Sequence, residues 1–308
     1  MRLAVKNIQT SLIFLARLSL SLQPNLIDLL LMATHEVSAL QGKIGECMVL
    51  LHDVFCKHGL RYYLIGGSML GAVRHKGFIP WEDYIDIAIP RRDYELLRKN
   101  CKEWLPEYME FVDHEVDDEY RPHFAKVQDA RTTLVEQGTQ NYVGGVYIDI
   151  FPFDGVPSGS ISRWWHIKRF DFWHRINYFL YRDPYKHGKG PSSWLPRMVQ
   201  ALFSRKKVHK KLDRIMTECD FETSAYVSHH NNQSPTHFFK KEVIGEPKLY
   251  DFADTRFYGV AMPDCYLTEY YGATYMQLPP EAKRIQHRHH YLNLRLPYRS
   301  YSKKEECL

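Results

Sequence analysis

The sequence lacks the patterns that mark several common classes of protein. Its 308 residues include six cysteines but no C-x-x-C pair, so the spacing indicates neither a zinc site nor a dense disulfide framework. No uninterrupted apolar run approaches the ~20 residues that a membrane-spanning helix needs. The chain also has no internal repeat, no low-complexity tract and no nucleic-acid-binding module. These absences favour a globular, cytoplasmic protein with reduced thiols and no nucleic-acid partner.

The overall composition is ordinary, and the charge is mildly basic. Hydrophobic residues make up 44% of the chain and charged residues 25%, as in typical soluble domains. The formal net charge of +5 suits anionic nucleotides or an anionic surface and is too small to indicate a nucleic-acid-binding protein. The 21 tyrosines and 16 phenylalanines are expected mainly in the core, although such rings also line glycan and nucleotide sites.

The first 34 residues differ from the rest of the chain. Arg2 and Lys6 precede the apolar run 12–20, as in a signal peptide, but Arg17 interrupts that run and no clear cleavage site follows. We expect residues 1–34 to form an N-terminal extension, either a packing helix or a poorly ordered segment. An amphipathic segment that associates with the inner face of a membrane is the alternative.

Basic and histidine-rich segments elsewhere favour structural explanations. The basic residues between 205 and 211 are interpreted as one solvated face of a helix. His229–His230 and the segment 287–290 do not have the i, i+4 spacing of a helical zinc motif. Packing or contact with phosphate is therefore favoured over zinc binding for these histidines.

The hydrophobic patterns predict an α+β fold, a small mixed sheet flanked by helices. We expect a core over residues 35–155, followed by a largely helical acceptor or lid region over 156–308. Helices are predicted over 36–58, 69–75, 92–105, 162–182 and 197–219, and strands over 62–65, 85–89, 124–129 and 147–151.

The segment 66–87 carries most of the functional information. Gly66 and Gly67 follow an apolar strand, and they predict a turn that exposes backbone N–H groups to phosphate at a helix start. Ser68 is expected to cap that helix and to offer its hydroxyl group. The basic triplet Arg74, His75 and Lys76 would neutralise a diphosphate.

Acidic residues follow this basic triplet. On an extended strand Glu82, Tyr84 and Asp86 would share one face. Asp149, a lone acid in an apolar strand, needs a partner, because a buried unpaired charge costs several kcal/mol. Two such carboxylates on neighbouring strands would hold Mg²⁺ through their oxygen atoms. The pattern predicts a metal-dependent phosphoryl or nucleotidyl transferase.

Three blocks of the chain resemble the LicD family of phosphocholine transferases, which is related to the fukutin group. The blocks are residues 66–95, 144–157 and 266–291, and the resemblance spans roughly 40–292. It implies a nucleotidyltransferase-like core. It also implies transfer of a phospho-alcohol, typically phosphocholine, from a CDP-linked donor such as CDP-choline to a hydroxyl of a cell-surface glycan, with Mg²⁺ or Mn²⁺. The acceptor glycan would be lipopolysaccharide, capsule or teichoic acid.

The resemblance also suggests roles for individual residues. Lys126 belongs to a Lys-x-x-Asp element of the family, and Lys283 and Arg284 would close over the donor. Where the family usually has Trp-Asp-Asp-Asp-Ile-Asp, this chain has Tyr84 at the fourth position, and a phenol is a poor ligand for a hard cation. The metal and catalytic residues would then be Asp86, Asp149 and Glu82.

The expected reaction is a direct in-line transfer in which CMP leaves. Two alternatives stay open on the sequence alone. A nucleotidyltransferase with the same core would release pyrophosphate instead of CMP. A catalytically weakened protein that binds a CDP-alcohol or a glycan is the other alternative, because Tyr84 replaces the usual metal-binding Asp.

Overall fold

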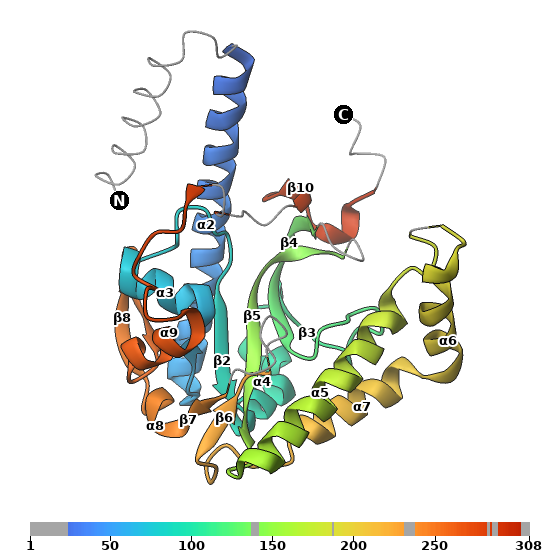
Figure 1. The fold of residues 1–308 in the computed structure, drawn as a ribbon. Helices are drawn as coiled ribbons and strands as arrows, with labels where there is room; N and C mark the ends of the chain where they lie inside the picture. Colours follow the sequence, from blue (N-terminus) through green and yellow to red (C-terminus); the bar gives the residue numbers. More distant parts are fainter. Residues whose placement is uncertain are drawn as a thin grey trace.

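The computed structural model describes residues 24–136, 142–186, 188–230, 238–281, 284 and 289–302, with side chains from residue 37 onward. It has the α+β architecture expected from the sequence, a large mixed sheet flanked by helices (Figure 1). In this part of the chain, no helix combines the length and the apolar character that crossing a membrane requires. Most of the predicted extension, residues 1–23, lies outside the described residues.

The sheet runs in the order β10-β4-β5-β2-β1-β9-β8. The pairs β2·β5 and β1·β9 are parallel, and the other pairs along this path are antiparallel. β3 adds to β4, while β6 and β7 extend the end of β5. The strands are β1 Tyr63–Leu64, β2 Asp86–Pro90, β3 Met109–Val112, β4 Ala125–Glu136, β5 Val143–Val156, β6 Tyr226–Ser228, β7 Phe239–Lys240, β8 Lys248–Phe252, β9 Thr255–Gly259 and β10 His289–Asn293.

Helices cover the sheet and build a separate arm at its side (Figure 1). The long α2 contributes Leu51 and Phe55 to a core shared with Ile87, Val127 and Ile150 of the sheet. α5, α6 and α7 enclose a second, smaller core. The helices are α2 Pro24–His58, α3 Gly66–His75, α4 Arg91–Trp104, α5 Ser160–Tyr181, α6 Trp194–Leu202, α7 Arg205–Met216, α8 Lys241–Ile244 and α9 Pro263–Tyr271, with 3-10 turns at Pro191–Ser193 and Tyr298–Ser300.

The structure differs from the sequence-based expectation in three places. The helix predicted over 69–75 begins at Gly66, and the helix predicted over 197–219 is divided into α6 and α7 at residues 203–204. Residues after 155 also complete the sheet, because β9 pairs with β1 and β10 pairs with β4. The expected division at residue 155 is therefore not a boundary of the sheet. The hairpin β8–β9 escaped detection because each of its strands has only five residues.

Buried histidines lie where the arm meets the sheet. His166 Nε2 and His230 Nε2 are 3.0 Å apart, and His123 Nε2 lies 2.7 Å from the carbonyl oxygen of His230. His229 is fully buried beside them. Burial lowers the pKa of His174 to about 4 and the pKa of His209 to about 3, and the nearby Arg121 adds to the effect at His174. Burial also lowers the pKa of His123, His166 and His230, so these imidazoles are neutral at physiological pH in the folded protein.

The neutral histidines predict that the protein loses stability in acid. The unfolded chain binds protons near pH 6.5 that the folded chain does not bind, so stability is full above pH 6.5 and is lost as the pH falls toward 4. Each deeply buried histidine contributes about 1.4 kcal/mol per pH unit to this loss. Urea unfolding between pH 7.5 and pH 5 measures it. His209→Phe is expected to flatten the pH dependence, and His290→Gln, which changes an exposed side chain, is the control. Identical pH dependence in His209→Phe and in the unchanged protein would contradict this explanation.

Candidate functional site

Asp86 and Asp149 are partners in the parallel pair β2·β5. Asp86 is the first residue of β2, and Asp149 lies inside β5, where its N–H donates to the carbonyl oxygen of Ile85 at 3.2 Å. Lys126 of β4 is the antiparallel partner of Asp149 on the other side. Register partners point to the same face of a sheet. Three neighbouring strands therefore present two carboxylates and one ammonium group on one face.

The two carboxylates influence each other electrostatically. Burial, then the negative charges of Asp149 and Glu82, raise the pKa of Asp86 well above its usual range, and Lys126 opposes this effect. Lys126 Nζ lies 4.0 Å from Asp149 Oδ1, contacts Glu136 and stands 3.3 Å from the centre of the Tyr147 ring. Lys126 therefore interacts with two carboxylates, those of Asp149 and Glu136. Such a site favours a further positive charge.

Ser68 holds the start of β2 instead of capping a helix. α3 is preceded by Ile65 in an extended conformation, and no side chain caps it. Ser68 is the third residue of α3, and its Oγ accepts the backbone N–H of Asp86 at 2.8 Å. The expected capping role is wrong because the helix begins two residues before Ser68. The hydroxyl fixes the backbone at one of the two acids.

The two glycines are the first residues of α3 rather than a separate turn. Gly66 has φ +52°, a left-handed conformation that glycine adopts without strain, and its N–H donates to Tyr266 Oη at 3.0 Å. A Cβ atom at Gly67 would lie 2.5 Å from Glu82 Oε2 and 2.6 Å from Tyr84 Oη. Glycine at position 67 thus leaves room for two side chains of the acidic segment at the helix start.

Glu82 and Tyr84 approach α3 together, although not as part of a strand. Because β2 begins only at Asp86, the alternation expected for residues 82–86 does not arise from strand geometry. A hydrogen bond joins the two side chains, and burial, Glu82 and Asp86 raise the pKa of Tyr84. The phenol therefore stays neutral at physiological pH and donates to the Glu82 carboxylate. Tyr84 supports Glu82 and is not a charged ligand.

The three residues of the basic triplet lie in different surroundings. Arg74 Nη1 donates to the carbonyl oxygen of Tyr275 at 2.9 Å, and Arg74 Nε donates to His75 Nε2 at 2.9 Å. Glu82 is the main negative group near the Arg74 guanidinium. Lys76 is exposed and ends α3 in a left-handed conformation. Arg74 therefore anchors the segment after α9, and the expected joint contact of all three residues with a diphosphate stays a prediction.

The late basic segment is only partly described. The Arg284 guanidinium lies 4.9 Å from the centre of the Trp81 ring, and Arg284 Nε donates to the carbonyl oxygen of Pro279. The His75 ring meets Trp81 edge-on at 6.2 Å. This arrangement brings Arg284 next to Trp81, which precedes Glu82, and the expected closure over the donor stays a prediction. Lys283 lies outside the described residues.

Three tyrosines of α9 were missed by the sequence analysis. Tyr266 accepts the N–H of Gly66, and a Cβ atom at Gly66 would lie 3.7 Å from Tyr270 Oη and 3.8 Å from Tyr271 Oη. Burial raises the pKa of Tyr271, as do Tyr270, Glu82 and Asp86. α9 therefore places hydroxyl groups beside the start of α3 and the acids. The only signal in the sequence was the block beginning at residue 266, which assigned no role to these rings.

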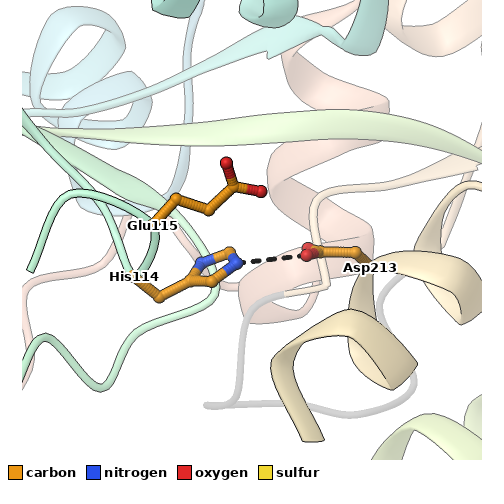
Figure 2. A group of neighbouring side chains, drawn as sticks. All are labelled: His114, Glu115 and Asp213. Atoms are coloured by element: carbon orange, nitrogen blue, oxygen red, sulfur yellow. Dashed lines mark hydrogen bonds and ion pairs between the residues drawn. The ribbon is translucent and has the colours of Figure 1, made fainter. Parts of the chain in front are cut away.

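A second group of possible metal ligands lies away from these acids. His114 and Glu115 follow β3, and Asp213 belongs to α7 (Figure 2). His114 Nε2 lies 3.1 Å from Asp213 Oδ2, while Arg98 contacts Glu115. These contacts already compensate the carboxylates, so we interpret the group as an ion-pair network between the arm and the sheet.

Comparison with known proteins finds a family model and several relatives that match this chain. The family model described as LicD/FKTN/FKRP, nucleotidyltransferase domain, matches residues 59–210. The chain is 27% identical over 254 residues to the lipopolysaccharide cholinephosphotransferase LicD of Haemophilus influenzae, a match that covers 77% of this chain and 89% of the relative. Uncharacterized proteins of Rickettsia prowazekii and Rickettsia typhi share 43% identity over 42 residues, which cover 14% of this chain and 16% and 14% of those proteins.

The space at Gly67 gives a direct test of the site. Gly67→Val would displace the flexible ends of Glu82 and Tyr84, so we expect the protein to stay folded and to lose affinity for CDP-choline in calorimetry. Gly45→Val on α2 is the matched control, because a Cβ atom there meets nothing within 4 Å. Equal affinity in both variants would mean that Gly67 serves packing alone.

Proposed function

The chain belongs to the LicD family, and we propose that it transfers phosphocholine, or a similar phospho-alcohol, from a CDP-linked donor to a hydroxyl group of a cell-surface glycan. The proposal rests on the long match to a lipopolysaccharide cholinephosphotransferase and on the side-by-side acids of β2 and β5. In this proposal the acceptor is a lipopolysaccharide, capsule or teichoic acid glycan, and the protein works in the cytoplasm at the inner face of the membrane.

The paired acids are the observation that carries the proposal. Asp86 and Asp149 share one face of the sheet, and burial together with the nearby negative groups Asp149 and Glu82 raises the pKa of Asp86. Carboxylate oxygens are the ligands that Mg²⁺ and Mn²⁺ prefer. Asp86, Asp149 and Glu82 would hold such an ion. When bound, it would supply positive charge against the diphosphate of the donor.

Other side chains have supporting roles in this proposal. Ser68 fixes the backbone of Asp86, and Tyr84 orients the Glu82 carboxylate through their hydrogen bond. Lys126 balances the charge of Asp149 from the opposite side. Arg74 keeps the segment after α9 against the site. The core 35–155 would thus perform the chemistry, while residues 156–308 would shape the acceptor side and complete the sheet.

The proposed reaction is a single displacement at phosphorus. The glycan hydroxyl oxygen forms a bond to the phosphorus atom that carries the alcohol, and the bond from that phosphorus to the bridging oxygen breaks, so that CMP leaves. Asp149, or a neighbouring acid, orients the hydroxyl and accepts its proton. Most of the acceleration would come from positioning and charge compensation, as in phosphoryl transfer generally.

Release of CMP from CDP-choline tests this proposal. With Mg²⁺ and a lipopolysaccharide acceptor, we expect the unchanged protein to release CMP, and Asp86→Asn and Asp149→Asn each to lower the rate by about 10²–10³-fold. Asp53→Asn, which changes an exposed acid on α2, is the control. CDP-ribitol and CDP-glycerol, tested alongside, identify the alcohol. Pyrophosphate as the product would indicate a nucleotidyltransferase. Binding of the CDP-alcohol without turnover would indicate a weakened enzyme.

The tyrosine in the acidic segment allows a separate prediction. Tyr84→Asp would place a further carboxylate near Glu82 and Asp86, and we expect Mg²⁺ affinity and CMP release to rise about tenfold, which corresponds to about 1.4 kcal/mol. Tyr84→Phe is the matched variant, because it removes only the hydroxyl that supports Glu82. The gain should disappear in Tyr84→Asp combined with Asp86→Asn. Brisk activity of the unchanged protein and a neutral or harmful Tyr84→Asp would show that Glu82 already supplies the missing ligand.

A further inference from the structure

The arm formed by α5, α6 and α7 has a large positive net charge. Residues 160–216 contain 14 Lys and Arg against 3 Asp and Glu, a formal charge of +11. The whole chain has +5, so the remaining residues together carry −6. Figure 1 shows this arm to one side of the sheet, with α6 at its far end. The small net charge of the whole chain is therefore the sum of a strongly basic arm and an acidic remainder.

The outer face of α6 is apolar as well as exposed. Trp194, Met198 and Leu202 follow one another at intervals of four residues, and their exposed fractions are 66%, 54% and 70%. Leu195 beside them is 46% exposed. The opposite face already supplies Val199 to the small core of the arm. The exposed stripe is thus an additional apolar surface, which a soluble protein rarely presents without a partner.

α5 also exposes aromatic side chains, and basic side chains lie close to them. Trp164, Trp165 and Phe172 are each more than half exposed. Lys168 follows Trp164 by one helical turn, and its Nζ lies 5.9 Å from the Trp164 ring centre. Exposed lysines on α7, including Lys206 and Lys210, add positive charge beside α6. Tryptophan and basic residues together are typical of surfaces that lie at the headgroup level of a bilayer.

We propose that this arm docks the protein on an anionic lipid bilayer, with the outer face of α6 at headgroup depth and the surrounding lysines and arginines against lipid phosphates. The positive charge of the arm favours a negatively charged partner. The apolar stripe favours a bilayer over a nucleic acid, because a nucleic acid would contact the basic residues through its phosphates and leave Met198 and Leu202 exposed to water. The basic residues at 205–211 are therefore part of a binding surface rather than a merely solvated face. The docking does not depend on the proposed transfer reaction.

Vesicle co-sedimentation tests this surface without any donor or acceptor. We expect the full chain to bind vesicles of phosphatidylglycerol and phosphatidylethanolamine, to bind phosphatidylcholine vesicles at least tenfold more weakly, and to dissociate at high salt. Lys206→Glu with Lys210→Glu should weaken binding at least tenfold. Trp194→Ala with Leu202→Ala should weaken it at least fivefold even at low salt, because it removes buried apolar area.

Matched control variants outside the arm show whether the effects are specific to the arm. Lys99→Glu with Lys102→Glu makes the same charge change on exposed positions of α4, and Val116→Ala with Leu249→Ala removes exposed apolar side chains outside the arm. Both should bind as the unchanged protein does, and far-UV circular dichroism should be the same for all variants. No vesicle binding, equal binding to neutral vesicles, or equal binding by the arm variants would overturn the proposal. Loss of binding in the charge variant alone, with duplex RNA bound as tightly as vesicles, would instead indicate a polyanion site.

Discussion

Two carboxylates held side by side on parallel strands set the main electrostatic constraint of this structure. Neighbouring strands lie ~4.8 Å apart, so Asp86 and Asp149 cannot both be charged without compensation. At an effective dielectric constant of about 20, two like charges ~5 Å apart repel by about 3 kcal/mol. Lys126 offsets part of this repulsion, but it also contacts Glu136. The sheet therefore has a local excess of negative charge at these two acids, which a bound divalent cation would compensate.

The surroundings of the acids follow from this arrangement. Parallel pairing of β2 with β5 requires a crossover, which α4, β3 and β4 provide, and β4 returns with Lys126 in register with Asp149. On the other side, pairing of β9 with β1 brings α9 and its tyrosines to the start of α3. Residues of the C-terminal half therefore form one wall of the site.

The sequence predicted those parts of the site that leave a local pattern. Asp149 is recognisable because it is a lone acid in an apolar strand, and Asp86 because it ends an acidic run before another strand. Ser68 and Tyr266 act through contacts with residues 18 and 200 positions away, and such contacts leave no periodic signal in either segment. The short strands β8 and β9 were missed for a related reason, because β9 pairs with the distant strand β1 and β8 pairs with β9, and neither partner is visible in the local pattern.

The acids of the sheet and the basic residues of the arm differ in how strongly salt affects them. The acids of the sheet are partly buried among protein groups, so salt screens them less than charges on the surface, and their spacing is set by the pairing of β2 with β5. The charges of the arm face water, where the Debye length is about 8 Å at physiological ionic strength, so their attraction to a negative surface varies with salt. Together they suit a protein that would hold a diphosphate through a metal ion at the sheet. The basic arm would meanwhile meet the anionic surface on which a lipid-linked glycan is presented.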